Sequence, residues 1–170
     1  MPITTNLSVT TVRSLEERIK SFLKSLAVKK GIAASEDQLV VRDILPKTDL
    51  NLANEDWKES LGSANAWNTV FDFRVPDKKI IAFYGVRNIG TNPLTTAIKF
   101  AVGPGGAKTK DIVNVEGLVT QKEREVIFST PILYEDGQYM FVQQYAKAAG
   151  TDSLVYLGFV CEPKGELISE

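Results

Sequence analysis

From Asn68 to its end, the chain is built of short segments rich in β-branched and aromatic residues. The segments are separated by residues typical of turns, such as Pro76-Asp77 and Gly103-Pro104-Gly105-Gly106. This pattern predicts strands, because β-branched and aromatic side chains favour extended backbone whereas Gly, Pro and Asp favour turns. The predicted strands are 68–75, 79–87, 95–102, 111–119, 124–130, 131–134, 138–146 and 153–162.

Short strands that follow one another without helical segments between them predict antiparallel pairing. About eight strands fill either two packed sheets or a closed barrel, and we favour two sheets with the connections of a jelly roll. Asp136-Gly137, between Tyr134 and Gln138, predicts a tight hairpin because both residues tolerate positive φ. The expected fold class is therefore mainly β: an antiparallel β-sandwich (jelly-roll-like) with an N-terminal amphipathic helix and an extended arm.

The N-terminal region has the clearest helical pattern of the sequence. Apolar residues recur there at spacings of three and four, with charged residues on the other faces. Ser14 and Glu17 match a capping box, and Gly31 follows the lysines of the last turn as a helix-ending residue. The pattern predicts a helix over 12–30.

The apolar stripe of this helix is narrow and follows a seam of Leu15, Ile19, Phe22 and Leu26. Such a seam can lie along the chain's own sheet or dock on another chain, and the sequence leaves both open. We favour docking outside the chain's own sandwich, because a self-sufficient β core does not need a helix to fill it. The seam is therefore a predicted interface.

Between the helix and the first long strand lies a mostly polar connector over 33–67, with a short strand-like piece from Gln38 to Ile44. Trp57 and Trp67 lie in this connector, and a large aromatic ring in a polar stretch anchors its segment to a surface. We favour anchoring within the chain over anchoring on a neighbour, and we add both residues to the predicted interface. The predicted division is a helical arm with its connector over 1–67 and a β-sandwich domain over 68–170.

With 170 residues, the chain has an ordinary size for one domain, and its formal net charge is −1. A balanced charge gives no bulk attraction to nucleic acid or to a membrane, so we expect neither as a partner. No stretch is long and apolar enough for a membrane span, and the N-terminus lacks the features of a signal peptide. We expect a protein made in a reducing, cytoplasm-like compartment, with its single cysteine, Cys161, buried in a strand.

The chain has few residues suited to catalysis. It contains no histidine and one cysteine, which removes the side chains most used for proton transfer and metal binding. Gly103 to Thr109 superficially resembles a phosphate loop, but it lacks the required spacing and precedes a predicted strand instead of a helix. The acidic residues of the β region fall mainly at strand ends and turns, where we expect them to be solvated: Glu116, Glu123, Glu125, Glu135, Asp136 and Asp152.

We therefore predict no enzyme, no catalytic residue, no cofactor and no metal site. Sugar binding remains open, because it needs only an aromatic platform and a few polar groups. Trp57, Trp67 or Tyr84 would provide that platform.

Four features together resemble virion structural proteins of tailed bacteriophages, of the capsid decoration (cement) type. They are the N-terminal helix, the Trp-containing connector, the phrase Leu39-Val40-Val41-Arg42-Asp43-Ile44-Leu45-Pro46 and the closing phrase Leu157-Gly158-Phe159-Val160-Cys161-Glu162-Pro163. The resemblance implies a β-sandwich module, often trimeric, that seats on a viral shell and reaches its neighbours with a terminal arm.

On this resemblance, the expected partners are major capsid or other virion proteins and further copies of the chain, with a trimer favoured. The expected location is the virion, after synthesis in the host cytoplasm. Tail, neck and baseplate components use similar modules, so the position within a particle stays open. A carbohydrate-binding or adhesion module is the alternative class, because fold alone does not determine function.

Overall fold

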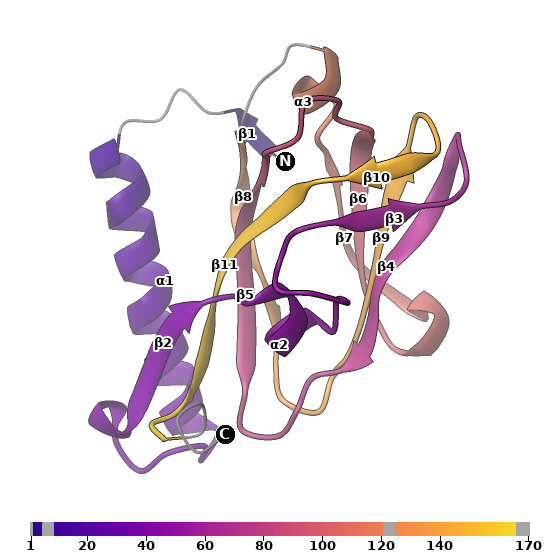
Figure 1. Ribbon diagram of the computed structural model, residues 1–170. Coiled ribbons are helices and arrows are strands. Elements are labelled where there is room, and N and C mark those ends of the chain that lie inside the picture. Colours follow the sequence, from indigo (N-terminus) through magenta and orange to yellow (C-terminus); the bar gives the residue numbers. More distant parts are fainter. Residues whose placement is uncertain (1, 5–8, 121–124, 166–170) are drawn as a thin grey trace.

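The computed structural model describes residues 2–4, 9–120 and 125–165 (Figure 1). The strands are β1 (Pro2–Thr4), β2 (Leu39–Asp43), β3 (Glu59–Leu61), β4 (Ala66–Arg74), β5 (Ile80–Asn88), β6 (Thr95–Val102), β7 (Lys108–Asn114), β8 (Glu125–Tyr134), β9 (Tyr139–Ala146), β10 (Gly150–Asp152) and β11 (Leu154–Pro163). The helices are α1 (Val9–Lys29), α2 (Pro46–Leu50) and α3 (Gly117–Thr120), with 3₁₀ turns η1 (Glu36–Gln38) and η2 (Pro104–Gly106). The predicted mainly β class, antiparallel pairing and N-terminal helix are confirmed.

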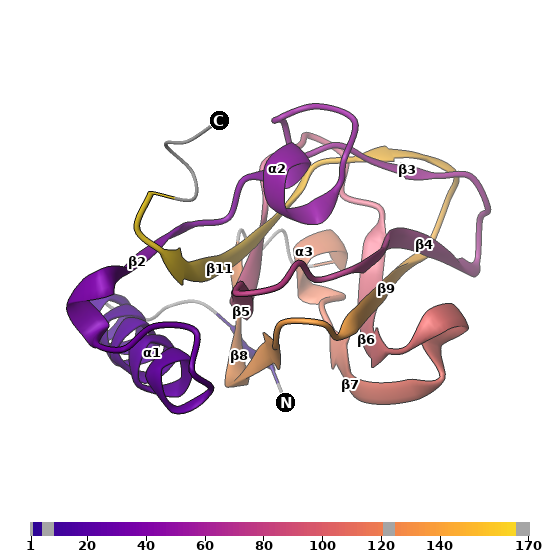
Figure 2. The same ribbon diagram turned by 90° about the horizontal axis from the view of Figure 1, so that it is seen from below.

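The strands form a five-stranded sheet in the order β1-β8-β5-β11-β2 and a four-stranded sheet in the order β4-β9-β6-β7. A short ribbon of β3 and β10 lies beside them. Figure 2 shows the two sheets facing each other, with α1 against the outer side of the five-stranded sheet. Every strand pair is antiparallel, as expected for strands joined without long helical crossovers.

The central strands coincide closely with the predicted segments, but three of the predicted strands are corrected. The strand predicted over 111–119 ends at Asn114, and α3 follows it. The segments predicted as 124–130 and 131–134 form one strand, β8, because a break in the register with β5 accommodates Pro131. Proline lacks the N–H that a regular ladder requires, so it is tolerated at such an irregularity.

The turn at Asp136-Gly137 does not form the predicted hairpin. Gly137 has the expected positive φ of 80°, and its N–H donates to the Val75 carbonyl. The flanking strands β8 and β9 belong to different sheets, because β8 pairs with β5 whereas β9 pairs with β4 and β6. The positive φ was predicted correctly for Gly137 but not for Asp136, and the turn connects the two sheets.

Helix α1 begins at Val9, so Ser14 and Glu17 lie inside the helix and the predicted capping box is wrong. Its C-terminal end matches the sequence pattern. Gly31 has a φ of 80°, its N–H donates to the Val28 carbonyl, and the Ile32 N–H donates to the Ala27 carbonyl. This left-handed termination favours glycine, which has no Cβ to clash.

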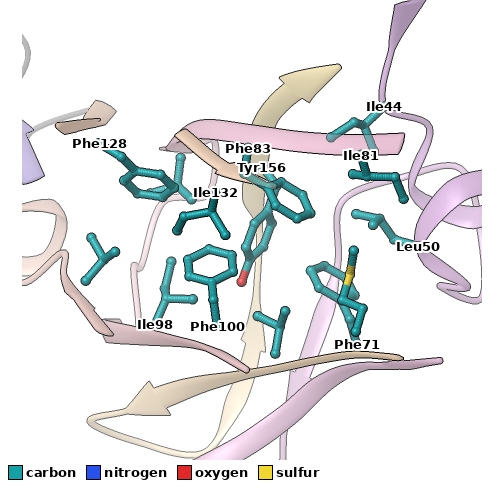
Figure 3. Packing of buried hydrophobic residues seen from close by; sticks show 14 of the residues in the cluster. Ile44, Leu50, Phe71, Ile81, Phe83, Ile98, Phe100, Phe128, Ile132 and Tyr156 are labelled. Carbon is teal, nitrogen blue, oxygen red and sulfur yellow. The ribbon is translucent and has the colours of Figure 1, made fainter. Parts of the chain in front are cut away.

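The main hydrophobic core fills the space between the two sheets (Figure 3). Phe83 of the five-stranded sheet and Phe100 of the four-stranded sheet have ring centroids 5.6 Å apart. Tyr156 lies between this pair of rings and Phe71. The ring centroids of Tyr156 and Phe71 are 4.9 Å apart. These large buried rings occupy the interior, so binding functions must use the outer surfaces of the molecule.

The first third of the chain shares this core, although the sequence analysis placed it outside. Ile44 and Leu50 belong to the same buried cluster as the sheet residues, and Figure 3 shows both pointing toward it. Strand β2 extends the five-stranded sheet by pairing with β11. The expectation of an arm and connector that leave the sheets to pack alone is therefore corrected: the residues before 68 supply part of the core.

Candidate interaction surfaces

The predicted helical seam faces the chain's own sheet along most of its length. Ile19 is 5% exposed and belongs to a second buried cluster with Phe159 and Cys161. Leu15 and Leu26 pack against the same cluster. The favoured expectation of docking outside the sandwich is therefore corrected for these three residues: the outer face of the five-stranded sheet is apolar, and α1 removes it from water. Cys161 is buried as predicted.

Phe22 is the residue of the seam that remains at the surface, with 52% of its side chain exposed. It lines a shallow groove of about 340 Å³ together with Ser21, Ser25, Leu26 and Lys29. Four of its five lining residues are exposed, and the fifth, Leu26, also packs against the cluster under α1. We call this groove the Phe22 groove.

Both tryptophans of the predicted interface are anchored within the chain. Trp57 stacks on Tyr156, with ring centroids 6.0 Å apart, and packs against the main core. Trp67 makes an edge contact with Tyr145 at 5.4 Å, and the Lys99 ammonium lies 4.8 Å from the centre of its ring. The structure thus separates the predicted residues: Trp57 lies near the five-stranded sheet, and Trp67 lies on the four-stranded sheet.

A cleft of about 390 Å³ lies beside the N-terminal half of α1, at the edge of β11 where β2 no longer pairs with it, and side chains from both faces of the five-stranded sheet line it. We call it the α1 cleft. Its floor includes Tyr84 and Gly158, and a Cβ at Gly158 would collide with the Ala82 carbonyl of the neighbouring strand. Its full set of lining residues is Val12, Glu16, Asp43, Ile44, Trp57, Tyr84, Arg87, Glu125, Ile127, Val155, Tyr156, Leu157 and Gly158.

The charged groups of the α1 cleft converge on Tyr84. Burial, and then the charge and hydrogen bonding of Glu16, raise the pKa of the Tyr84 hydroxyl. Arg87 pairs with Glu125 across the rim, with the Arg87 Nε 2.7 Å from the Glu125 Oε1. Since this ion pair balances itself, Glu16 and Asp43 leave the cleft with negative charge.

A cluster of paired charges around Arg42 links β2 and α2 to the neighbouring strand β11. The Arg42 guanidinium donates two hydrogen bonds to Asp49, at 2.7 and 2.9 Å, and one to Glu162 at 2.7 Å. Lys79 Nζ lies 3.2 Å from the Asp49 Oδ1, which also accepts one of the hydrogen bonds from Arg42. Burial alone raises the pKa of Asp49, but the hydrogen bonds from Arg42 and the Leu45 amide outweigh it and lower the pKa. These paired charges have a structural role.

Two carboxyl groups are buried together at the β3–β10 ribbon. Glu59 and Asp152 are direct cross-strand partners, and both are 1% exposed. Asp152 accepts hydrogen bonds from Asn88 and from the amide and hydroxyl of Thr95. Glu59 accepts one from the Leu154 amide, and its Oε2 has no partner among the described residues. Burial, and then the charge of Asp152, raise the pKa of Glu59 to about 9.

The raised pKa makes the stability of the fold sensitive to pH. The folded chain keeps a proton on Glu59 that the unfolded chain, with a pKa near 4.5, releases. Stability is therefore highest below the unfolded-state pKa and is lost as the pH rises toward the folded-state value of about 9.

Replacing Glu59 with Gln is expected to raise the free energy of unfolding at pH 8 by about 2 kcal/mol, because glutamine stays neutral and can donate to Asp152. Urea unfolding between pH 5 and pH 8.5 measures the effect, with the exposed Glu36→Gln as control. If the free energy of unfolding changes with pH in the same way in the wild type and in Glu59→Gln, Glu59 is not protonated in the folded chain over this pH range.

The expectation that the acidic residues of the β region are solvated is wrong for Asp152, which is buried in the polar network above. Glu123 lies outside the described residues. Within the described ranges, no three acidic, histidine or cysteine side chains come together as metal ligands would. Over the same ranges, none of the helices combines the length and the apolar character needed to cross a membrane.

The described residues offer several surfaces for interaction, among them the Phe22 groove, the α1 cleft and the face of the four-stranded sheet around Trp67. Another is a groove of about 680 Å³ beside Ile89 and α3. Comparison with models of known protein families gives no match, and a search of curated proteins likewise finds no relative of this chain.

Proposed function

We propose that the chain is a non-enzymatic structural protein that assembles on a viral particle, as a capsid decoration (cement) subunit. Its partners are then the major capsid protein or other virion proteins, and its location is the virion. The observation that carries this proposal is the order of the strands in the two sheets.

The order β8-β5-β11-β2 in one sheet and β4-β9-β6-β7 in the other is the order that eight strands take in a jelly roll. Each sheet alternates a strand from the first four of these eight with one from the last four, as folding a long antiparallel ribbon over a core requires. We infer from this a jelly-roll sandwich, with β1 added at one edge. The architecture is common in viral capsid proteins and in lectins, which makes assembly and glycan binding the two functions to separate.

The filled interior favours assembly over catalysis. Phe83, Phe100 and Tyr156 occupy the centre of the core, so no substrate fits between the sheets. What the described surface offers is exposed apolar side chains, of which Phe22, Ile89 and Ile112 are the largest. They lie on different parts of the fold, and a single exposed apolar side chain is common on soluble proteins, so each has to be tested as a contact by substitution.

A substitution of Phe22 tests self-assembly. Light scattering after size-exclusion chromatography is expected to give a defined oligomer, with a trimer favoured, for the wild type. Phe22→Asp is expected to give a monomer with unchanged β-rich circular dichroism, because a charge in the Phe22 groove opposes burial in a contact. Ile19→Asp is unsuitable for this test, since Ile19 is buried against the sheet.

The control is Ile112→Asp, a change to an equally exposed apolar residue on β7 of the other sheet. An oligomer lost in Phe22→Asp and kept in Ile112→Asp supports α1 as the contact. The reverse pattern moves the contact to the four-stranded sheet, and a monomeric wild type that binds no isolated particle contradicts the assembly role.

Carbohydrate binding is the second candidate, because Trp67 and Tyr145 lie together on the face of the four-stranded sheet beside Lys99 and Gln143. An aromatic pair flanked by polar groups is a suitable platform for a sugar. This function would be favoured if the wild type is a stable monomer that binds a glycan and the Trp67→Ala variant does not bind it. A tail, neck or baseplate role would instead appear as binding to those parts of a particle.

A further inference from the structure

The α1 cleft has the dimensions and lining of a binding site that the proposed function does not use. Its volume of about 390 Å³ is within the range of small-molecule and side-chain pockets. Aromatic residues line it from two sides, with Trp57 from the connector and Tyr84 from β5. The lining has a net charge of −2, because it contains three carboxylates and one guanidinium: Glu16, Asp43, Glu125 and Arg87.

The positions of these charges point to a cationic ligand. Arg87 and Glu125 neutralise each other at the rim. Glu16 from α1 and Asp43 from the end of β2 both lie close enough to act on the Tyr84 hydroxyl. Two carboxylates from different elements thus face the same aromatic group, which is the arrangement that binds ammonium and guanidinium groups.

The same sheet face already holds a cation one turn further along α1. Lys20 Nζ lies 5.0 Å from the centre of the Phe159 ring. Phe159 in turn stacks on Tyr84, with ring centroids 5.6 Å apart. Lys20 therefore covers one ring of this aromatic pair, whereas α1 presents the carboxylate of Glu16 to the other. Beside Tyr84 the nearby cation is Arg87, whose charge is already balanced by Glu125.

We propose that the α1 cleft binds a single lysine or arginine side chain of a partner protein, with Glu16 and Asp43 pairing with its charge and with Tyr84 and Trp57 contacting its apolar stem. The inference depends on this cleft alone, so it can hold or fail independently of the particle on which the chain acts.

The test uses the full chain and small probes that carry only the side chain of interest. N-acetyl-L-arginine amide and N-acetyl-L-lysine amide are titrated to about 50 mM, a range that detects millimolar binding. N-acetyl-L-citrulline amide is the matched neutral probe, because it replaces the guanidinium with a urea of similar shape. NMR chemical shifts of Tyr84, Gly158 and the Trp57 indole report occupancy of the cleft.

The two cationic probes are expected to shift these signals, and citrulline amide is expected to leave them unchanged. Glu16→Gln and Asp43→Asn are each expected to weaken binding about tenfold, the effect of losing one charge-assisted hydrogen bond. Glu17→Gln removes a carboxylate from an exposed position of the same helix and is expected to bind as the wild type does.

Both variants retain an oxygen acceptor, and the NMR fingerprint verifies that each is folded. If Glu16→Gln loosens α1, Asp43→Asn alone decides the test, because Asp43 is exposed at the end of β2. Equal binding of citrulline amide, equal weakening in Glu17→Gln, or no shift at the highest concentration would each overturn the proposal.

Discussion

Replacing Asp49 with Ala is expected to lower the free energy of unfolding by about 3–5 kcal/mol, the usual effect of removing one partner from a buried ion pair. Asp49 is 2% exposed and accepts hydrogen bonds from Arg42, from the Leu45 amide and from Lys79. Without it, two cations stay close together in a largely buried site. Glu162 would then be their only carboxylate partner among the residues described in this network.

Urea unfolding monitored by circular dichroism measures this change. The control is Asp56→Ala, because Asp56 pairs with Lys58 at the exposed surface, where an ion pair contributes about 0–1 kcal/mol. The slope of free energy against urea should stay the same in both variants, which indicates that the folded state is unchanged. An Asp49→Ala protein as stable as the control would mean that the Arg42 cluster does not hold β2 and α2 in place.

The central strands were predictable because their pattern is local. In β5, for example, a run of β-branched and aromatic residues is bounded by turn residues at both ends, and the strand is buried on both faces. Such a run favours a strand in any antiparallel arrangement. The end of α1 was predictable for the same reason, since Gly31 supplies a backbone conformation that no distant contact has to impose.

Long-range pairing was not predictable from the same signals. The Asp136-Gly137 turn has the residues of a hairpin, but its flanking strands find their partners in different sheets. The choice depends on which strands complete each sheet, and residues far apart in the sequence decide it. Strand β3 was missed because it is three residues long and lies in a polar connector.

The candidate sites were likewise predictable only where the signal is local in the sequence. The seam of α1 was predicted as an apolar stripe, but periodicity does not tell which surface the stripe covers. The α1 cleft joins Glu16, Asp43 and Tyr84 from three elements, and nothing in their spacing signals that they meet. Glu59 gave no signal either, because its buried neighbour Asp152 lies 93 positions further along the sequence.

A fragment that begins at residue 68 is expected to be unfolded, because the residues before it contribute to three buried hydrophobic clusters: the main core, the cluster under α1 and a small cluster around Leu94. It would lose six large buried side chains: Ile19, Leu23, Leu39, Ile44, Leu50 and Leu61. At roughly 1.5–3 kcal/mol each, their burial contributes about as much as the whole stability of an ordinary domain, roughly 5–15 kcal/mol.

Removing residues 1–67 also exposes the face of the five-stranded sheet that α1 covers. Ile80, Phe159 and Cys161 on the outer face of the five-stranded sheet would face water once α1 is removed. Glu162 would lose its hydrogen bond from Arg42. Without β2, β11 becomes an edge strand with unpaired backbone groups. A fragment with this edge and a solvent-exposed apolar sheet face is expected to aggregate.

The first third of the chain and the strands after it form one cooperative core. Thermal unfolding and two-dimensional NMR of fragment 68–170, beside the full chain under the same conditions, show whether the strands can fold without the residues before them. We expect a cooperative transition and dispersed amide signals for the full chain, and neither for the fragment. A soluble fragment with dispersed signals and its own cooperative transition would mean that the strands after residue 68 fold alone.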